Sequence, residues 1–66
     1  MNKYSVAVFA WCDRLQHVYI VETNHPDEAI QDLMNRYPDE WHEARIHQIL
    51  DNRGNARFYK TIKKAR

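Results

Sequence analysis

The sequence has few of the residues that small proteins use as cross-links and flexible hinges. Its 66 residues include one cysteine, one glycine and two prolines. The single cysteine, Cys12, excludes a disulfide within the chain, and a single glycine excludes a glycine-rich phosphate loop. Because a lone thiol suits a reducing compartment, we expect a cytoplasmic protein.

Long hydrophobic runs are also lacking. The most apolar stretch, residues 4–11, is followed at once by Asp13 and Arg14. It is far shorter than the roughly 18 residues of a membrane span, and no small-residue cleavage site follows it. We expect neither a membrane segment nor a signal peptide.

Residue patterns of catalytic and metal sites are absent as well. Ser5, the single serine, lies in a predicted strand without the glycine elbow of a nucleophilic serine. The four histidines and Cys12 show no zinc-ligand spacing; His42 and His47, for example, are five residues apart. We therefore predict no enzyme, no metal and no cofactor.

The overall composition predicts one small globular domain spanning residues 1–66. Hydrophobic residues make up 44% of the chain and charged residues 29%. A domain this short buries only about 60% of its unfolded surface, so its stability is marginal. Without disulfides or a metal, oligomerisation is the usual remaining source of stability.

Two strands at the N-terminus form a predicted hairpin. Residues 4–11 and 15–22 are rich in β-branched and aromatic side chains, and residues 12–14 form a short link. Both faces of this hairpin are apolar, which is unusual for an antiparallel pair with one wet side.

A helix is predicted to begin at Pro26, after a cap at Asn24 or His25, and to end at Tyr37 before Pro38. Its apolar residues share one stripe. Beyond it, we expect Trp41 to fold back over the end of the core.

Two further strands, residues 44–50 and 56–62, flank a turn at residues 51–54 in which Gly54 takes the left-handed position. The order is β-β-α-β-β. We predict an α+β fold in which one helix covers one face of a four-stranded antiparallel sheet of order 2-1-3-4.

One helix leaves the second face of the sheet uncovered. We assign nine residues to the helix face: Val6, Val8, Ala10, Val18, Ile20, Ile46, Leu50, Phe58 and Ile62. We assign eleven to the other face: Ala7, Phe9, Trp11, His17, Tyr19, Val21, Arg45, His47, Ile49, Arg57 and Tyr59. A first hairpin out of register by one residue would exchange side chains between the faces but leave both apolar.

An uncovered apolar face indicates a binding surface. Our first hypothesis is a non-enzymatic protein-interaction module, either self-associating as a homodimer or acting as an inhibitor or adaptor of a larger protein. The predicted interface residues are Phe9, Trp11, Tyr19, Val21 and Tyr59.

The alternative is binding of single-stranded nucleic acid or a nucleotide, with bases stacked on these aromatic side chains. Residues 53–66 carry six cations and no acid. The predicted phosphate ligands are Arg45, Arg57, Lys60, Lys63 and Lys64. A basic edge strand is also an ordinary protection against aggregation. A tiny oligomeric enzyme is the third and weakest hypothesis.

Overall fold

A computed structural model describes residues 1–64, which form four strands, one α-helix and one short 3-10 turn. In chain order these are β1 (Asn2–Phe9), η1 (Trp11–Asp13), β2 (Leu15–Thr23), α1 (Pro26–Asn35), β3 (Glu43–Ile49) and β4 (Ala56–Lys63). The β-β-α-β-β order is confirmed.

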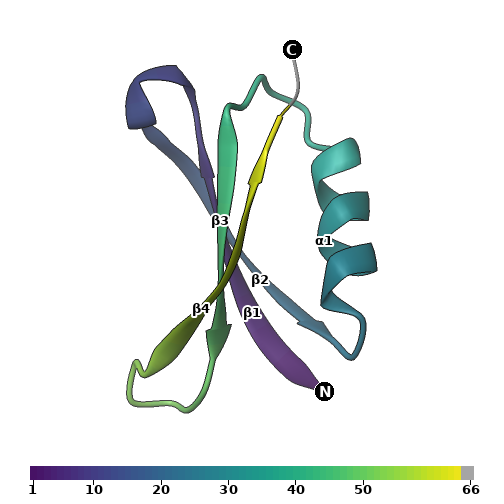
Figure 1. Cartoon of the computed structure of the whole chain (residues 1–66), viewed down its shortest axis with the longest axis vertical. Helices are drawn as coiled ribbons and strands as arrows, with labels where there is room; N and C mark the ends of the chain where they lie inside the picture. Colours follow the sequence, from purple (N-terminus) through teal and green to yellow (C-terminus); the bar gives the residue numbers. More distant parts are fainter. Residues whose placement is uncertain (65–66) are drawn as a thin grey trace.

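The sheet has the predicted topology. All three neighbouring strand pairs are antiparallel, and the order is β2-β1-β3-β4, so β2 and β4 are the edges of an open sheet. The two halves of the sheet twist across each other, and α1 lies against one face only (Figure 1). The fold is therefore α+β with one uncovered sheet face.

The helix begins at the predicted proline. Pro26 occupies the first turn and Asp27 follows it, where a carboxylate favours the positive end of the helix dipole. His25 is the N-cap without a capping side-chain bond, and its N–H donates instead to Oγ1 of Thr23 at 2.8 Å. The last helical residue is Asn35, two residues before the predicted end.

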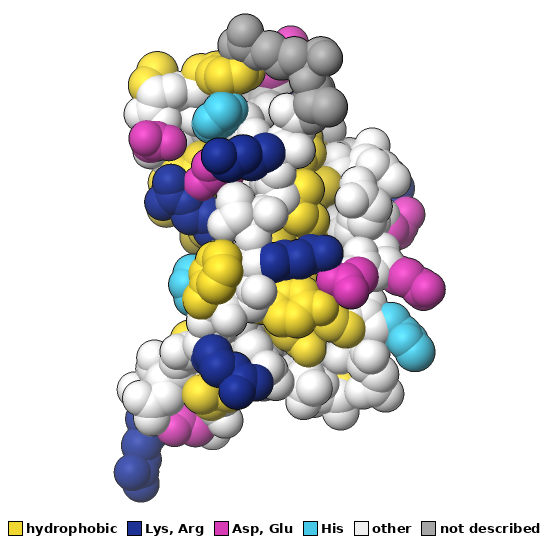
Figure 2. Space-filling view, in the orientation of Figure 1, with side chains coloured by type: hydrophobic (Ala, Val, Ile, Leu, Met, Phe, Trp, Pro, Cys, Tyr) yellow, Lys and Arg dark blue, Asp and Glu magenta, His cyan; other side chains and the backbone are white. Residues whose placement is uncertain are grey.

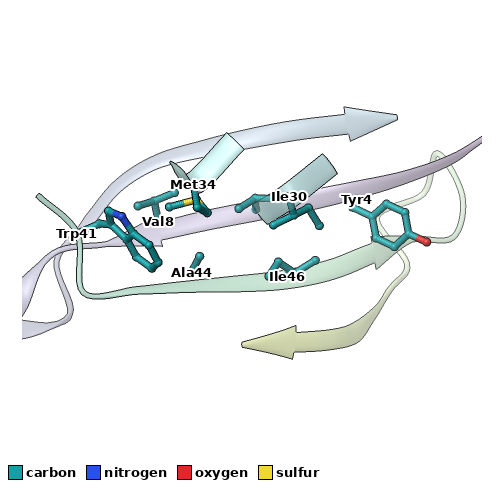
Figure 3. Packing of buried hydrophobic residues seen from close by; sticks show 8 residues of the cluster. Tyr4, Val8, Ile30, Met34, Trp41, Ala44 and Ile46 are labelled. Carbon is teal, nitrogen blue, oxygen red and sulfur yellow. The ribbon is translucent and has the colours of Figure 1, made fainter. Parts of the chain in front are cut away.

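The core lies between α1 and the centre of the sheet. Val6 and Val8 of β1, Ile46 of β3 and Ile30 of α1 are fully buried in one cluster. Trp41 is 7% exposed and closes one end of this cluster, as predicted (Figure 3). These contacts supply the apolar burial on which a small domain depends.

The second hairpin turn has the predicted left-handed glycine. Gly54 has φ +89°, the left-handed region that a side chain rarely adopts. Asp51 Oδ1 accepts the N–H groups of Arg53 at 2.8 Å and Asn55 at 3.2 Å. A single aspartate thereby satisfies much of the turn's backbone.

The predicted register of the first hairpin is wrong by one residue. Val8 of β1 pairs with His17, but the next residue, Phe9, pairs with Leu15. Gln16 is therefore an extra residue in β2, which forms a β-bulge. Every later residue of β2 is turned to the opposite face, because side chains alternate along a strand.

The bulge reverses five face assignments in β2. Tyr19 pairs with Val6 and Val21 with Tyr4, which places both on the helix face. Val18 and Ile20, assigned to the helix face, lie on the uncovered face. His17, opposite buried Val8, is also on the helix side rather than the uncovered one.

A second bulge corrects the fourth strand in the same way. Ile46 pairs with Lys60 but His47 pairs with Phe58, leaving Tyr59 as the extra residue. Phe58 therefore lies on the uncovered face, whereas Tyr59 packs against the core. Arg57 is opposite Gln48, on the helix side, rather than on the uncovered face.

Two further assignments to the helix face fail because the strands end earlier than predicted. β1 ends at Phe9, so Ala10 belongs to the turn, and β3 ends at Ile49, so Leu50 is 53% exposed. Strand ends are the least constrained part of a sequence-based prediction.

Candidate protein-interaction surface

The uncovered face carries an apolar strip along β2 and β1. Its β2 side chains are Leu15, Val18 and Ile20, which are 53%, 56% and 60% exposed. Leu15 pairs with Phe9 and Val18 with Ala7 on the neighbouring strand. We call these five residues the β2 strip. The exposed aliphatic side chains of β2 and the partly exposed Ala7 and Phe9 of β1 form a contiguous patch, which is the kind of surface that binds a partner.

The hairpin turn continues from the end of this strip. Ala10 N–H donates to Arg14 O at 2.8 Å, and Cys12 and Asp13 both have positive φ, at 69° and 56°. The turn presents Trp11, which is 42% exposed and whose ring centroid lies 4.2 Å from that of His42. Trp11 is thus a partly accessible aromatic next to the strip.

A cationic side chain borders the strip on the β3 side. The guanidinium of Arg45 lies 4.3 Å from the centroid of Phe9 and bonds to Glu43. It also lies 3.7 Å from Asp13 of the turn. The hydrogen bond from Arg45 holds the pKa of Glu43 below its usual value. The ionic network fixes the rim of the strip next to Phe9.

The far edge of the same face has one more exposed aromatic. Phe58 is 59% exposed and contacts His47 edge to face, with 5.6 Å between ring centroids. Across the sheet, Ser5 and His47 lie between Ile20 and Phe58. Phe58 is therefore separate from the β2 strip.

Three of the five predicted interface residues are on the wrong face. Tyr19 packs edge-on against Tyr37, with 6.2 Å between centroids. The ring centroids of Tyr59 and Tyr4 are 5.4 Å apart, and Val21 is packed against the core. Phe9 is on the uncovered face as predicted.

The residues missed by the sequence reasoning are Leu15, Val18, Ile20 and Phe58. The signal that pointed to them was the apolar character of both strand faces. The sheet face of these side chains was mispredicted because each edge strand contains one extra residue at a bulge. No local sequence feature marks either bulge.

The predicted anion-binding residues do not form one site. Arg57 bonds to Oε1 of Gln48 at 3.2 Å on the helix side, whereas Arg45 is on the other face. Lys64 lies over the ring of Trp41, and Lys63 is opposite Glu43 in the sheet. Basic side chains are spread over the β4 side of the molecule rather than gathered (Figure 2).

Lys60 takes part in a clamp between β4 and α1. Its Nζ lies 2.7 Å from Oδ1 of Asp27, the same oxygen that accepts the Tyr59 hydroxyl at 2.9 Å. The bonds from Lys60 and Tyr59 lower the pKa of Asp27, and the Asp27 acceptor raises the pKa of Tyr59. Phosphate binding by Lys60 would compete with this contact.

Metal ligands, a histidine–tyrosine contact and membrane helices are the remaining features of residues 1–64. No group of three or more metal-ligating side chains is gathered there. His17 Nδ1 is 2.5 Å from the hydroxyl of Tyr37, a contact between β2 and the segment after α1. Burial chiefly raises the pKa of Tyr37. In the same part of the chain, no helix has the length and apolar character needed to cross a bilayer.

Comparison with protein-family models, curated proteins and solved structures finds no match.

Proposed function

We propose that the protein is a small non-enzymatic binding module whose uncovered sheet face receives another protein. The observation that carries the proposal is the exposure of three adjacent aliphatic side chains, Leu15, Val18 and Ile20, each more than half accessible. Leaving such a patch in water is unfavourable by about 25 cal/mol per Å², and a protein surface is the partner that removes it.

Nucleic acid is the weaker candidate. The exposed strip is chiefly aliphatic, whereas single-strand binding relies on aromatic stacking platforms. Two of the predicted platforms, Tyr19 and Tyr59, pack on the helix side. The predicted phosphate ligands Arg45 and Lys60 are paired with acids. These contacts favour a protein partner, with an inhibitor or adaptor role as one form of it. The exposed lone Cys12 fits the reducing interior of a cell.

The proposal is tested by capture with matched variants in nuclease-treated cell extract. Wild-type protein, Ile20→Lys and Gln31→Lys are immobilised in parallel. Gln31 is an exposed residue of α1, so its change adds the same charge on the opposite side. We expect protein, including the chain itself, to be retained by wild type and Gln31→Lys and lost from Ile20→Lys. Equal retention by all three contradicts the proposal.

A parallel titration tests the alternative. Fluorescently labelled single-stranded oligothymidine and oligouridine are added to the wild type, and anisotropy is followed against salt. We expect no saturable binding at physiological salt. Binding that falls steeply with salt and disappears in Lys60→Glu/Lys63→Glu would replace the protein-binding proposal with the nucleic-acid alternative.

A further inference from the structure

The two edges of the sheet differ in how they are protected. β4 carries Arg57, Lys60 and Lys63 and has its bulge near the middle. Lysines and bulges are the usual devices that prevent an edge strand from pairing with another chain. The regular part of β2, residues 17–23, has no lysine, no arginine and no proline. The edge formed by β2 is therefore open to strand addition.

The exposed aliphatic residues nearest the centre of β2 lie on either side of it. Tyr19 is the middle of the nine residues Leu15–Thr23. Val18 and Ile20 flank it on the uncovered face, and His17 and Val21 are next on the helix face. A two-fold strand pair brings residue i of one copy opposite residue j of the other, so aliphatic residues on both sides of the centre would face each other.

We propose that the β2 strip binds a second copy of this chain, by antiparallel pairing of β2 with β2 across a two-fold axis at Tyr19. This inference rests on the proposed function and names its partner. Val18 of each copy then lies opposite Ile20 of the other, and the four side chains form one apolar cluster on the uncovered face. The two four-stranded sheets become one eight-stranded sheet.

The facing side chains favour this register over its neighbours. With Tyr19 at the centre, Glu22 lies opposite Gln16, and the two Glu22 side chains are about 20 Å apart along the strands. No like charges face each other. Centring the pair on Ile20 would place Glu22 opposite Val18, and centring it on Val18 would place Ile20 opposite bulged Gln16.

The pairing also meets the stability need of the chain. A 66-residue domain without a disulfide has a small core, and pairing adds main-chain hydrogen bonds and apolar contacts without new secondary structure. Self-pairing of β4 would not stabilise the chain in this way, because an antiparallel pair would align rows of cations.

Sedimentation equilibrium across a micromolar concentration range tests the pairing. We expect wild type to approach twice the 8.0 kDa of one chain at high micromolar concentration. Ile20→Lys should stay at 8.0 kDa and keep its circular dichroism spectrum. Phe58→Lys, an equally exposed change on the same face but beside the other edge, should still dimerise. Loss of the dimer in Phe58→Lys would overturn edge pairing, because it would indicate face-to-face packing.

Disulfide trapping tests the register. In a Cys12→Ser background, Val18→Cys protein is mixed with Ile20→Cys protein under mild oxidation. We expect the mixture to form a mixed disulfide dimer faster than either variant alone, since directly opposite residues are within disulfide reach. Val18→Cys mixed with Thr61→Cys is the control. Equal trapping in the control mixture would contradict the register.

The two proposals fail separately. If wild type stays monomeric at high micromolar concentration while Ile20→Lys still abolishes capture of another protein, self-pairing is wrong and the binding face stands. If wild type is monomeric and capture is unaffected by Ile20→Lys, both are wrong.

Discussion

Ile46 and Ile20 lie in strands of one sheet and point to opposite faces. Ile46 is fully buried beneath α1, whereas Ile20 is 60% exposed. Both faces are built from β-branched residues, yet one helix covers only one of them. Equal hydrophobicity in a sequence therefore does not imply equal roles: one isoleucine stabilises the monomer, and we assign the other to binding. Substitutions on the two faces separate these roles.

The largest expected effect is at the buried face. Ile46→Ala removes a fully buried side chain and leaves a cavity, which lowers the free energy of unfolding by about 2–5 kcal/mol. For a domain of this size, that is much of the total stability. Urea unfolding followed by circular dichroism should show a partly or wholly unfolded variant. A loss below about 1 kcal/mol would contradict the description of the core.

The clamp between α1 and β4 should have the next largest effect. Asp27→Asn removes the ion pair with Lys60 and weakens the bond from Tyr59, so the urea midpoint should fall. The contribution has a defined pH dependence. Because the folded pKa of Asp27 is lowered, the stabilisation is complete above the usual aspartate pKa of about 3.9 and is lost as pH falls through the folded value.

The measurement is the urea midpoint of both proteins from about pH 6 down to about pH 2. Wild type should lose more stability than Asp27→Asn over this range, and the two curves should converge in acid. Asp51 also has a lowered pKa, but it titrates in both proteins and cancels in the difference. Parallel curves would mean that Asp27 is not clamped.

The fold was more accessible to sequence reasoning than the surface. Alternating apolar residues, Pro26 and Gly54 predicted the four strands, the helix and the strand order, because each signal is local or follows from general connection rules. The 3-10 turn η1 was not predicted, since Trp11 was placed in the first strand. The faces of β2 and β4 depended on two single-residue bulges. Gln16 and Tyr59 are ordinary strand residues, and only tertiary packing decides that they have no partner across the sheet.

A smaller effect is expected at the turn that links β1 and β2. Cys12 and Asp13 both occupy left-handed conformations, which are unfavourable for residues with a side chain. Asn-Gly is the preferred pair for two such positions. Cys12→Asn/Asp13→Gly should raise stability by about 1 kcal/mol, net of the weak ion pair from Asp13 to Arg45.

Thermal unfolding checks this change, which corresponds to a rise of about 4–8 °C for a domain of this size. Cys12→Ser is the control, because it removes the thiol but keeps a side chain at φ +69°. A double variant no more stable than this control would contradict the assignment of strain to the turn.

The smallest effect on the monomer is expected on the uncovered face. Ile20→Ala should change the free energy of unfolding by no more than about 0.5 kcal/mol when urea curves are extrapolated to low protein concentration. At higher concentration, wild type should become more stable than Ile20→Ala, since association stabilises the folded state by mass action. A large loss at every concentration would place Ile20 in the core and contradict the comparison with Ile46.

Hydrogen exchange at the two edge strands is the most direct test of where a partner binds. Amide exchange of β2 and β4 is compared in dilute and concentrated wild-type protein, with Ile20→Lys as the reference for an unpaired edge. Protection of β2 amides should increase with concentration while that of β4 amides stays constant, because only β2 gains hydrogen bonds from a second copy. Unchanged β2 exchange, or protection gained at β4 instead, would contradict the pairing of β2 with a second copy of the chain.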